Sequence, residues 1–342
     1  MTPTMTLEVS LDCTERCFQL PEWRELLERD PNRHIFATPE WNKLWWDEFG
    51  HSGVPKDLFL LMMKRADEVI GIVPLYRKQE GDAKVLRFIG GIDLTDYLGP
   101  ICAVEDRVDV IDSLVDWLIS STVEWDEFDA HNMPVPFQFA ELLVESADRR
   151  GLEFKLDQEE TAAVLPLPSS WEEYEAQLKS KDRHELRRKA RRLEREHPDA
   201  RVRTATPETL DVDLKTFVEM HRGAEGHKGH FMKPEIATFF ERIAKDFSAK
   251  GWLQLDLLEI GNSAVAGTFS FVQDGRFYLY NSAYEPDAAR LSPGLVLVSE
   301  LVKRSIGEGL EIFDFLRGPE RYKYQLGGQA VPLNNVRLTR ES

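Results

Sequence analysis

Two stretches that lie far apart in the chain repeat the same pattern. Residues 60–71 and residues 255–267 each read as an apolar strand, a polar turn and a second apolar strand with a glycine inside it. Phe128-Asp129 and Phe313-Asp314 also correspond, because each pair follows a predicted helix. Recurrence of this kind indicates two related α/β domains fused in tandem. The alternative is a chance similarity between two strand hairpins.

Length and composition agree with two domains in a protein that spans no membrane. A chain of 342 residues is longer than one domain usually is, and we expect a boundary between residues 1–168 and 169–342. The formal net charge of −17 argues against a general binder of DNA or anionic membranes. No run of 18 apolar residues and no leader-like start occur, so a cytoplasmic location is predicted.

The cysteines predict neither disulfides nor a metal site. There are three of them, so they cannot all pair, and the spacing of Cys13 and Cys17 lacks the partner ligands of a zinc site. Together with Cys102 they are expected to be packing residues. No metal is expected in the protein.

Hydrophobic periodicity gives a provisional order of elements. In the first half we expect strands and helices at residues 7–11, 21–29, 39–49, 58–65, 69–76, 85–89, 108–120, 125–130, 137–150 and 154–167. Within residues 39–49, Trp41, Trp45 and Phe49 repeat every four residues and are expected to face the core. In the second half we expect elements at 201–205, 207–221, 234–247, 253–259, 264–272, 277–284, 292–306, 311–316, 321–326 and 331–340.

The stretch 291–328 organises the second half. Ser292 suits the N-cap of a helix and Pro293 its first turn, while Gly307 and Gly309 end that helix. A short aromatic strand follows, and polar residues gather directly after it. Polar groups concentrated past a buried strand are typical of a site that carries chemistry.

A basic helix is predicted at residues 171–197, between the two halves. From residue 179 to residue 203 the chain is positive by six, while the rest carries −23. The helix places four arginines at four-residue intervals on one face: Arg183, Arg187, Arg191 and Arg195. Guanidinium groups suit phosphates. The alternative is a solvated basic face that balances acidic neighbours.

The order of elements resembles the GNAT acyltransferase fold, an α/β (α+β mixed-sheet) architecture. Two tandem GNAT-like domains are implied, the N-terminal one degenerate and the two joined by the basic helix. The segment Arg290-Leu-Ser-Pro-Gly294 stands where GNAT enzymes bind the pyrophosphate of acyl-CoA, with Pro293 in place of the usual first glycine. The segment 322–328, Tyr-Lys-Tyr-Gln-Leu-Gly-Gly, is similar to the terminal signature of the FemAB-like branch, with Leu326 replacing an aromatic residue.

The whole chain also resembles acetyltransferases encoded near cellulose and exopolysaccharide synthesis genes. The likeness lies in its Pro-Glu-Trp start, its arginine-rich linking helix and its Leu-Ser-Pro-Gly segment. The GNAT resemblance implies direct transfer of an acyl group from acetyl-CoA or another acyl-CoA to an amine or hydroxyl, without an acyl-enzyme. The residues that the GNAT resemblance assigns to CoA binding are Ser282, Ala283, Tyr284, Arg290, Leu291, Ser292, Gly294 and Leu295.

The resemblances to GNAT enzymes and to the FemAB-like branch imply the catalytic residues. Tyr322 and Tyr324 are expected near the CoA sulfur, and Asp314 is either a base or a structural hydrogen-bonding group. Lys323, with Arg317 beside it, is expected to hold the acceptor or to stabilise charge during transfer. The alternative for Lys323 is an ion pair with a nearby carboxylate.

The acceptor is the least defined part of the interpretation. Candidate acceptor-binding residues are Asn281, Arg317, His221, Asp96 and Tyr97, with His227 and His230 as further histidines in a glycine-containing loop. The implied acceptor is a small molecule or a saccharide, such as a cell-envelope or exopolysaccharide precursor. Two alternatives stay open: a FemAB-type transferase that uses charged tRNA, with the arginines as the RNA contact, and a non-catalytic binding protein on the same fold.

Overall fold

The structure is a computed structural model that describes residues 7–12, 14–223 and 231–340. The chain forms two units, Met1–Thr161 with Val331–Ser342 and Ala162–Ala330, hereafter unit 1 and unit 2. The chain leaves unit 1 within strand β7 (Glu153–Pro166) and returns within strand β13 (Gln329–Thr339). The strand predicted at 331–340 therefore completes unit 1, although it follows the second half in sequence.

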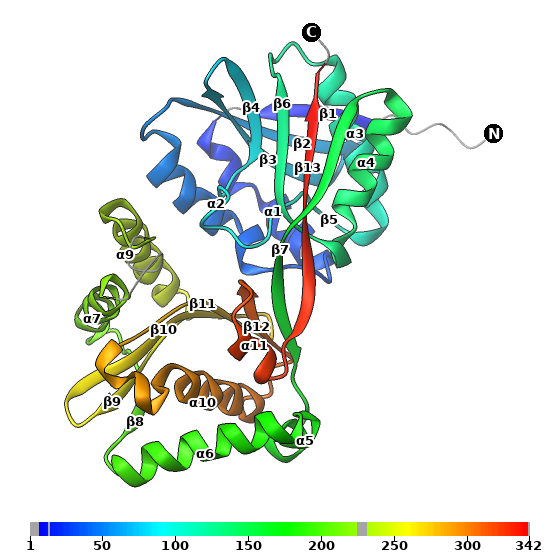
Figure 1. The fold of residues 1–342 in the computed structure, drawn as a ribbon. Helices are drawn as coiled ribbons and strands as arrows, with labels where there is room; N and C mark the ends of the chain where they lie inside the picture. Colours follow the sequence, from blue (N-terminus) through cyan, green and yellow to red (C-terminus); the bar gives the residue numbers. More distant parts are fainter. Residues whose placement is uncertain (1–6, 13, 224–230, 341–342) are drawn as a thin grey trace. The chain divides into compact units, whose positions relative to one another are not determined.

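Unit 1 is a mixed sheet covered by helices (Figure 1). Its strands lie in the order β1-β2-β3-β4-β6-β13, and only β4 and β6 run parallel among these neighbours. The core lies between the sheet and helices α3 and α4, and it includes Leu61, Val110, Leu114, Phe128 and Leu143. The elements are β1 (Leu7–Asp12), α1 (Pro21–Arg29), α2 (Pro39–Trp45), β2 (Lys56–Arg65), β3 (Glu68–Glu80), β4 (Ala83–Phe88), β5 (Ile101–Cys102), α3 (Arg107–Ser120), β6 (Glu127–Pro134) and α4 (Phe139–Arg150).

Unit 2 repeats this plan, with strands in the order β7-β12-β11-β10-β9-β8. Helices α10 and α6 lie on one side of its sheet, and α7 and α9 lie on the other (Figure 1). The elements are α5 (Trp171–Gln177), α6 (Ser180–Glu196), β8 (Arg201–Thr204), α7 (Leu210–Arg222), α9 (Pro234–Ala249), β9 (Leu253–Ile260), β10 (Ser263–Gln273), β11 (Arg276–Tyr284), α10 (Pro293–Gly307), β12 (Ile312–Arg317) and α11 (Arg321–Gln325).

The predicted repeat is confirmed by topology. Each unit contains one strand, two helices, three antiparallel strands, a helix and then a strand parallel to the third of the three. Phe128 of unit 1 pairs with Leu86 and Phe313 of unit 2 pairs with Phe277, each across that parallel junction. The two Phe-Asp pairs therefore occupy equivalent places in the two sheets.

Two predicted helices are interrupted. The prediction of one continuous helix over residues 171–197 is wrong. The chain is extended at Leu178 (ψ 143°), which separates α5 from α6. Leu178 is buried in the core of unit 2, and this tertiary burial outweighs the helical pattern on either side. The helix expected at 39–49 ends as α2 at Trp45 and continues as a π-helical turn, Trp46–Gly50. Trp41 and Trp45 are buried as predicted, and Phe49 is half-buried.

Cys17 and Cys102 are buried thiols without disulfides, and burial raises the pKa of Cys17 to about 12. Cys13 lies outside the described residues. Across residues 7–12, 14–223 and 231–340, no three His, Cys, Asp or Glu side chains group closely enough to hold a metal ion. Over the same residues, no helix combines the length and the apolar character needed to cross a membrane.

Candidate functional site

The candidate site begins where two parallel strands of unit 2 part. Strands β11 and β12 pair over three positions only, from Arg276 with Ile312 to Tyr278 with Asp314. Strand β11 then continues to Tyr284 without β12 beside it. The carboxyl ends of parallel strands are the usual place for ligands in α/β sheets. Separation of the two strands leaves backbone and side chains of β11 open to a ligand there.

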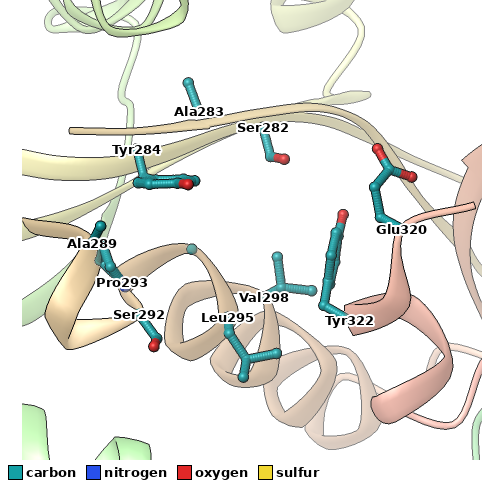
Figure 2. A pocket seen from close by; sticks show the side chains of 11 residues that line it. Ser282, Ala283, Tyr284, Ala289, Ser292, Pro293, Leu295, Val298, Glu320 and Tyr322 are labelled. Carbon is teal, nitrogen blue, oxygen red and sulfur yellow. The ribbon is translucent and has the colours of Figure 1, made fainter. Parts of the chain in front are cut away.

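A cavity of about 280 Å³ lies at this opening (Figure 2). Strand β11 contributes one wall, the start of α10 and the segment before it contribute the second, and α11 with the residue before it contributes the third. The lining residues are Ser282, Ala283, Tyr284, Ala289, Ser292, Pro293, Gly294, Leu295, Val298, Glu320 and Tyr322. The cavity is therefore mainly apolar, with a few hydroxyl groups and one carboxylate.

The N-terminus of α10 lines one part of the cavity. Ser292 occupies the N-cap position as predicted, but it adopts a left-handed conformation (φ 54°) and its side chain makes no capping hydrogen bond. Pro293 has no backbone N–H, so the helix offers the amides of Gly294 and Leu295 without a side-chain cap. Uncapped amides at a helix N-terminus attract anions, and phosphate groups in particular.

Asp314 is buried at the last position where β12 pairs with β11. Its Oδ1 accepts a hydrogen bond of 2.8 Å from the backbone N–H of Leu316, which has a positive φ of 58°. The register of β12 against β7 is irregular between Asp314 and Arg317. This contact fits the role of Asp314 as a structural hydrogen-bonding group rather than as a base. Asp314 is also not among the residues that line the cavity.

The hydroxyl groups of Tyr322 and Ser282 lie at the same cavity, the first on α11 and the second on β11 (Figure 2). Burial, with a smaller contribution from the charge of Glu320, raises the pKa of Tyr322 above its usual range. A tyrosine hydroxyl is protonated at neutral pH even at its usual pKa, and the shift keeps Tyr322 a hydrogen-bond donor at higher pH as well.

Lys323 points away from solvent and back toward the end of β12. Its Nζ donates to the carbonyl oxygen of Leu316 at 3.2 Å and to that of Arg317, and it lies 3.0 Å from Oε2 of Glu320. Two hydrogens of the ammonium group meet these carbonyl oxygens, and Glu320 contacts the group as an ion pair. The contact with Glu320 is the ion pair with a nearby carboxylate that was the alternative to a role of Lys323 in transfer. Lys323 does not line the cavity.

The predicted acceptor residues His221 and Asn281 lie together. Nε2 of His221, on α7, is 2.8 Å from Oδ1 of Asn281, on β11. Because side chains alternate along a strand, Asn281 and its neighbour Ser282 point to opposite faces of the sheet. The pair therefore lies on the α7 face, while the cavity opens on the α10 face.

The remaining predicted residues are scattered. Arg290 pairs with Glu196 of α6 at 2.6 Å, Leu291 is buried in the core, and Tyr324 is exposed. Asp96 and Tyr97 are buried in unit 1, where Tyr97 contacts the rings of His34, Phe36 and Phe137. His227 and His230 lie outside the described residues.

Sequence reasoning missed four residues that line the cavity: Ala289, Pro293, Val298 and Glu320. The sequence predicts Pro293 in the first turn of a helix and as a departure from the GNAT signature, but not as a residue of the site. A signal for Glu320 was present, since it stands three residues before Lys323 at the start of a short helix, a spacing at which opposite charges meet.

The arginines of α6 are partly used within unit 2. Arg187 makes a paired contact with Glu175, with both N–O distances 2.8 Å, and Arg183 donates to the carbonyl oxygen of Glu175. Arg191 and Arg195 are exposed. On the helix face predicted to bind phosphate, Arg183 and Arg187 therefore contact Glu175, while Arg191 and Arg195 are exposed to solvent.

Comparison with known proteins agrees with this geometry. Residues 180–324 match the acetyltransferase (GNAT) domain family. The match covers the cavity, α6 and the short helix α11 almost to its end. No protein with a curated function matches the chain in sequence.

Solved structures resemble most of the chain or nearly all of it at low sequence identity. FemX has a TM-score of 0.67 at 12% identity and covers 96% of both chains. A conserved protein of unknown function from Bacteroides thetaiotaomicron has a TM-score of 0.60 at 12% identity, covering 97% of this chain and 100% of its own. The C-terminal domain of a putative lysylphosphatidylglycerol synthetase from Agrobacterium fabrum has a TM-score of 0.51 at 11% identity, covering 79% and 81%.

These likenesses concern the fold. The predicted mixed α/β architecture with a GNAT-like fold is confirmed, and the fold is similar to that of FemX. The second half is similar to the GNAT domain family over residues 180–324. The resemblance to exopolysaccharide-associated acetyltransferases stays a prediction.

Proposed function

We propose that unit 2 is an acyl-CoA-dependent acyltransferase that moves an acyl group directly to an acceptor. The observation that carries the proposal is the cavity between the parted end of β11 and the uncapped N-terminus of α10. A mainly apolar cleft with a few convergent polar groups is the usual form of a small-molecule site.

The residues present fit an acyl-CoA. The amides of Gly294 and Leu295 would hold the pyrophosphate at the helix N-terminus. A Cβ added at Gly294 would lie 3.6 Å from the ring of Tyr284, so the glycine keeps the entrance between these residues wide. Ala289, Leu295 and Val298 offer apolar surface to the pantetheine chain. Once bound, the thioester supplies an acyl group activated for attack by a nucleophile.

The chain's own groups would assist this attack. Backbone N–H groups around Ser282 to Tyr284 are suited to polarise the thioester carbonyl, because they need no reorganisation during the reaction. Tyr322, held in its protonated form, would donate a hydrogen bond to the developing thiolate. His221 with Asn281 would contact the acceptor from the α7 face. The acceptor is proposed to be a small molecule or saccharide. The more specific proposal, a cell-envelope or exopolysaccharide precursor, rests only on the resemblance to exopolysaccharide-associated acetyltransferases.

A FemAB-type transfer from charged tRNA is the second candidate. The exposed Arg191 and Arg195 on α6 favour it, since basic groups on one helix face are suited to a nucleic-acid backbone. An observation against this candidate is that the guanidinium of Arg187 is already paired with the carboxylate of Glu175, which makes it less available to a phosphate. Binding of tRNA through several phosphates should weaken steeply with salt, whereas binding of CoA in the cavity should weaken less.

Calorimetry and a CoA-release assay test the proposal together. Acetyl-CoA should bind at micromolar to low millimolar concentration, and CoA should appear when an acceptor is added. Absence of binding at millimolar acetyl-CoA would refute the acyl-CoA assignment. Binding without turnover on any nucleophile would favour the non-catalytic alternative.

A further inference from the structure

Two arginines from different parts of unit 2 converge on the carboxylate of Glu196, the last residue of α6. Nε of Arg192 lies 3.0 Å from Oε1 of Glu196, and Nη1 of Arg290 lies 2.6 Å from Oε2. Arg195 lies 3.6 Å from Oε1, which is beyond hydrogen-bond distance. We call Arg192, Glu196 and Arg290 the Glu196 cluster. Its two guanidinium groups outweigh its one carboxylate, so the cluster is positively charged.

The fold holds this cluster beside the start of α10. Helix α6 runs along α10 (Figure 1), and Leu193 of α6 is buried in the core to which both helices contribute. The last turn of α6 therefore meets the short 3₁₀ helix Pro286–Leu291, which carries Arg290. Ala289 and Ser292, on either side of Arg290 in the chain, line the cavity. A group held by the cluster would thus lie next to the segment at which the pyrophosphate is proposed to bind.

The cluster is open to an anionic ligand. The side chain of Arg290 is 60% exposed, and that of Arg192 is 32% exposed. Each of these arginines uses one nitrogen to bind Glu196, whereas a guanidinium group has five N–H donors. The other donors can hold the oxygens of a phosphate group, whose geometry the planar guanidinium fork matches. A phosphate can therefore bind here without displacing the carboxylate.

We propose that the Glu196 cluster binds the 3′-phosphate of CoA, and that the acyl donor is therefore a free acyl-CoA rather than an acyl phosphopantetheine on a carrier protein. This inference rests on the acyl-CoA function proposed above. A phosphate monoester carries about two negative charges at neutral pH, which suits a positively charged cluster. In CoA one ribose joins this phosphate to the pyrophosphate, so the two groups must bind near each other. The phosphopantetheine of a carrier protein has no 3′-phosphate and would leave the cluster unoccupied.

Calorimetry with two thioesters tests the inference. Acetyl-CoA and acetyl-3′-dephospho-CoA differ in this one phosphate, so the ratio of their Kd values measures its contact with the protein. The wild type should bind acetyl-CoA about tenfold more tightly, the lower end of the range for hydrogen bonds to charged groups, because the cluster is partly exposed. This preference should disappear in Arg192→Gln with Arg290→Gln. The Kd for acetyl-3′-dephospho-CoA should change by less than about threefold in that variant.

Arg195→Gln is the matched control for Arg192→Gln. Each variant removes one arginine from the same turn of α6, but Arg195 makes no hydrogen bond to Glu196. The preference for acetyl-CoA should fall in Arg192→Gln and stay as in the wild type in Arg195→Gln. This comparison separates a phosphate contact from a general effect of charge on α6. Both variants should keep their thermal stability, because exposed ion pairs contribute little to it.

Competition by nucleotides tests the wild type without a substitution. Adenosine 3′,5′-bisphosphate carries the 3′-phosphate, whereas AMP lacks it. The bisphosphate should therefore displace acetyl-CoA at about tenfold lower concentration than AMP does. Equal potency of the two nucleotides would contradict a site for the 3′-phosphate.

Three results with the thioesters would overturn the inference. The first is equal Kd values for the two thioesters in the wild type, and the second is an equal loss of preference in Arg192→Gln and Arg195→Gln. The third is an equal loss of affinity for both thioesters in Arg192→Gln, which would give the arginine a structural role. If the wild type binds neither thioester, the proposed acyl-CoA function itself fails, and the same measurement shows this separately.

Discussion

Asp314 Oδ1 accepts a hydrogen bond of 2.8 Å from the backbone N–H of Leu316, two residues further along β12. This bond stabilises the left-handed conformation of Leu316, which lies in the irregular part of β12 between Asp314 and Arg317. A buried carboxylate thus shapes the end of the strand without lining the site.

The first prediction concerns Asp314. Asp314→Asn keeps an oxygen that can accept from Leu316, so acetyl-CoA binding should persist and turnover should stay within about tenfold of the wild type. Asp314→Ala removes the acceptor from a buried amide and should destabilise unit 2 by about 1–3 kcal/mol. Urea unfolding and steady-state kinetics measure the two effects. A stable Asn variant that binds acetyl-CoA normally but has lost a thousandfold in turnover would restore Asp314 as the base.

The second prediction concerns Gly294. Gly294→Val should weaken acetyl-CoA binding by at least tenfold, because the side chain would fill the entrance beside Tyr284. Gly307→Ala is a matched control, since its Cβ would meet no atom within 4 Å at the other end of α10. Calorimetry of both variants provides the comparison. Equal affinities in Gly294→Val and the wild type would place the ligand elsewhere.

The third prediction concerns the basic helix α6. Arg191→Glu with Arg195→Glu should change the free energy of unfolding by less than about 0.5 kcal/mol per site, because both side chains are exposed. Acetyl-CoA affinity should not change either. Binding of tRNA to the wild type and the double variant, measured across a salt series, tests the second candidate function. Tight wild-type binding that falls steeply with salt and disappears in the variant would favour charged tRNA as the donor.

The fourth prediction concerns pH and a buried network in unit 1. His131 lies 2.7 Å from Asp129 and 2.6 Å from Glu159 through its two ring nitrogens. Burial opposes the charged ring, but these two carboxylates outweigh it and raise the pKa of His131 to about 9. Since the folded pKa lies above the unfolded value of about 6.5, this stabilisation is complete below pH 6.5 and is lost as the pH rises to 9.

Thermal or urea unfolding between pH 6 and pH 10 checks this expectation. The wild type should lose on the order of 3 kcal/mol across the window, the amount that corresponds to the shift in pKa. His131→Gln removes the titrating group, so its stability should start lower and vary less over the same range. A wild-type stability that does not fall between pH 6.5 and pH 9 would contradict the assigned charge state of His131.

Local sequence patterns predicted much of the fold. Alternating apolar residues gave the strand pairs of both units, and Ser292-Pro293 marked the start of α10. The contiguous residues 282–284 and 292–295 line the cavity because they belong to one strand end and one helix start, which are local features. The repeat between the units followed from the same periodicity.

The features that sequence reasoning missed depend on distant contacts. The break at Leu178 arises from burial against the core of unit 2, and the partner strand of β13 is set by long-range pairing with β6. The orientation of Lys323 depends on the positive φ of Gly318, which turns the chain so that the ammonium meets two carbonyls. No spacing of residue types encodes these contacts directly.

The fifth prediction concerns the number of acyl-CoA molecules bound per chain. In unit 1, α3 is the counterpart of α10, but Asp106 precedes its first residue and is buried. Arg65 and Arg29 contact this carboxylate at 2.8 Å and 3.1 Å. A phosphate would meet a negative group at this helix N-terminus, so unit 1 should bind no acyl-CoA. Calorimetry should therefore give one site per chain, and a stoichiometry of two would contradict this.

The most direct test of the central claim is a crystal structure of the protein grown with acetyl-CoA. We predict density for one ligand in unit 2, with its pyrophosphate at the amides of Gly294 and Leu295 and its thioester near Ser282, Tyr322 and Glu320. Density in unit 1 alone, or an empty cavity at millimolar acetyl-CoA, would contradict the assignment of unit 2 as the acyltransferase.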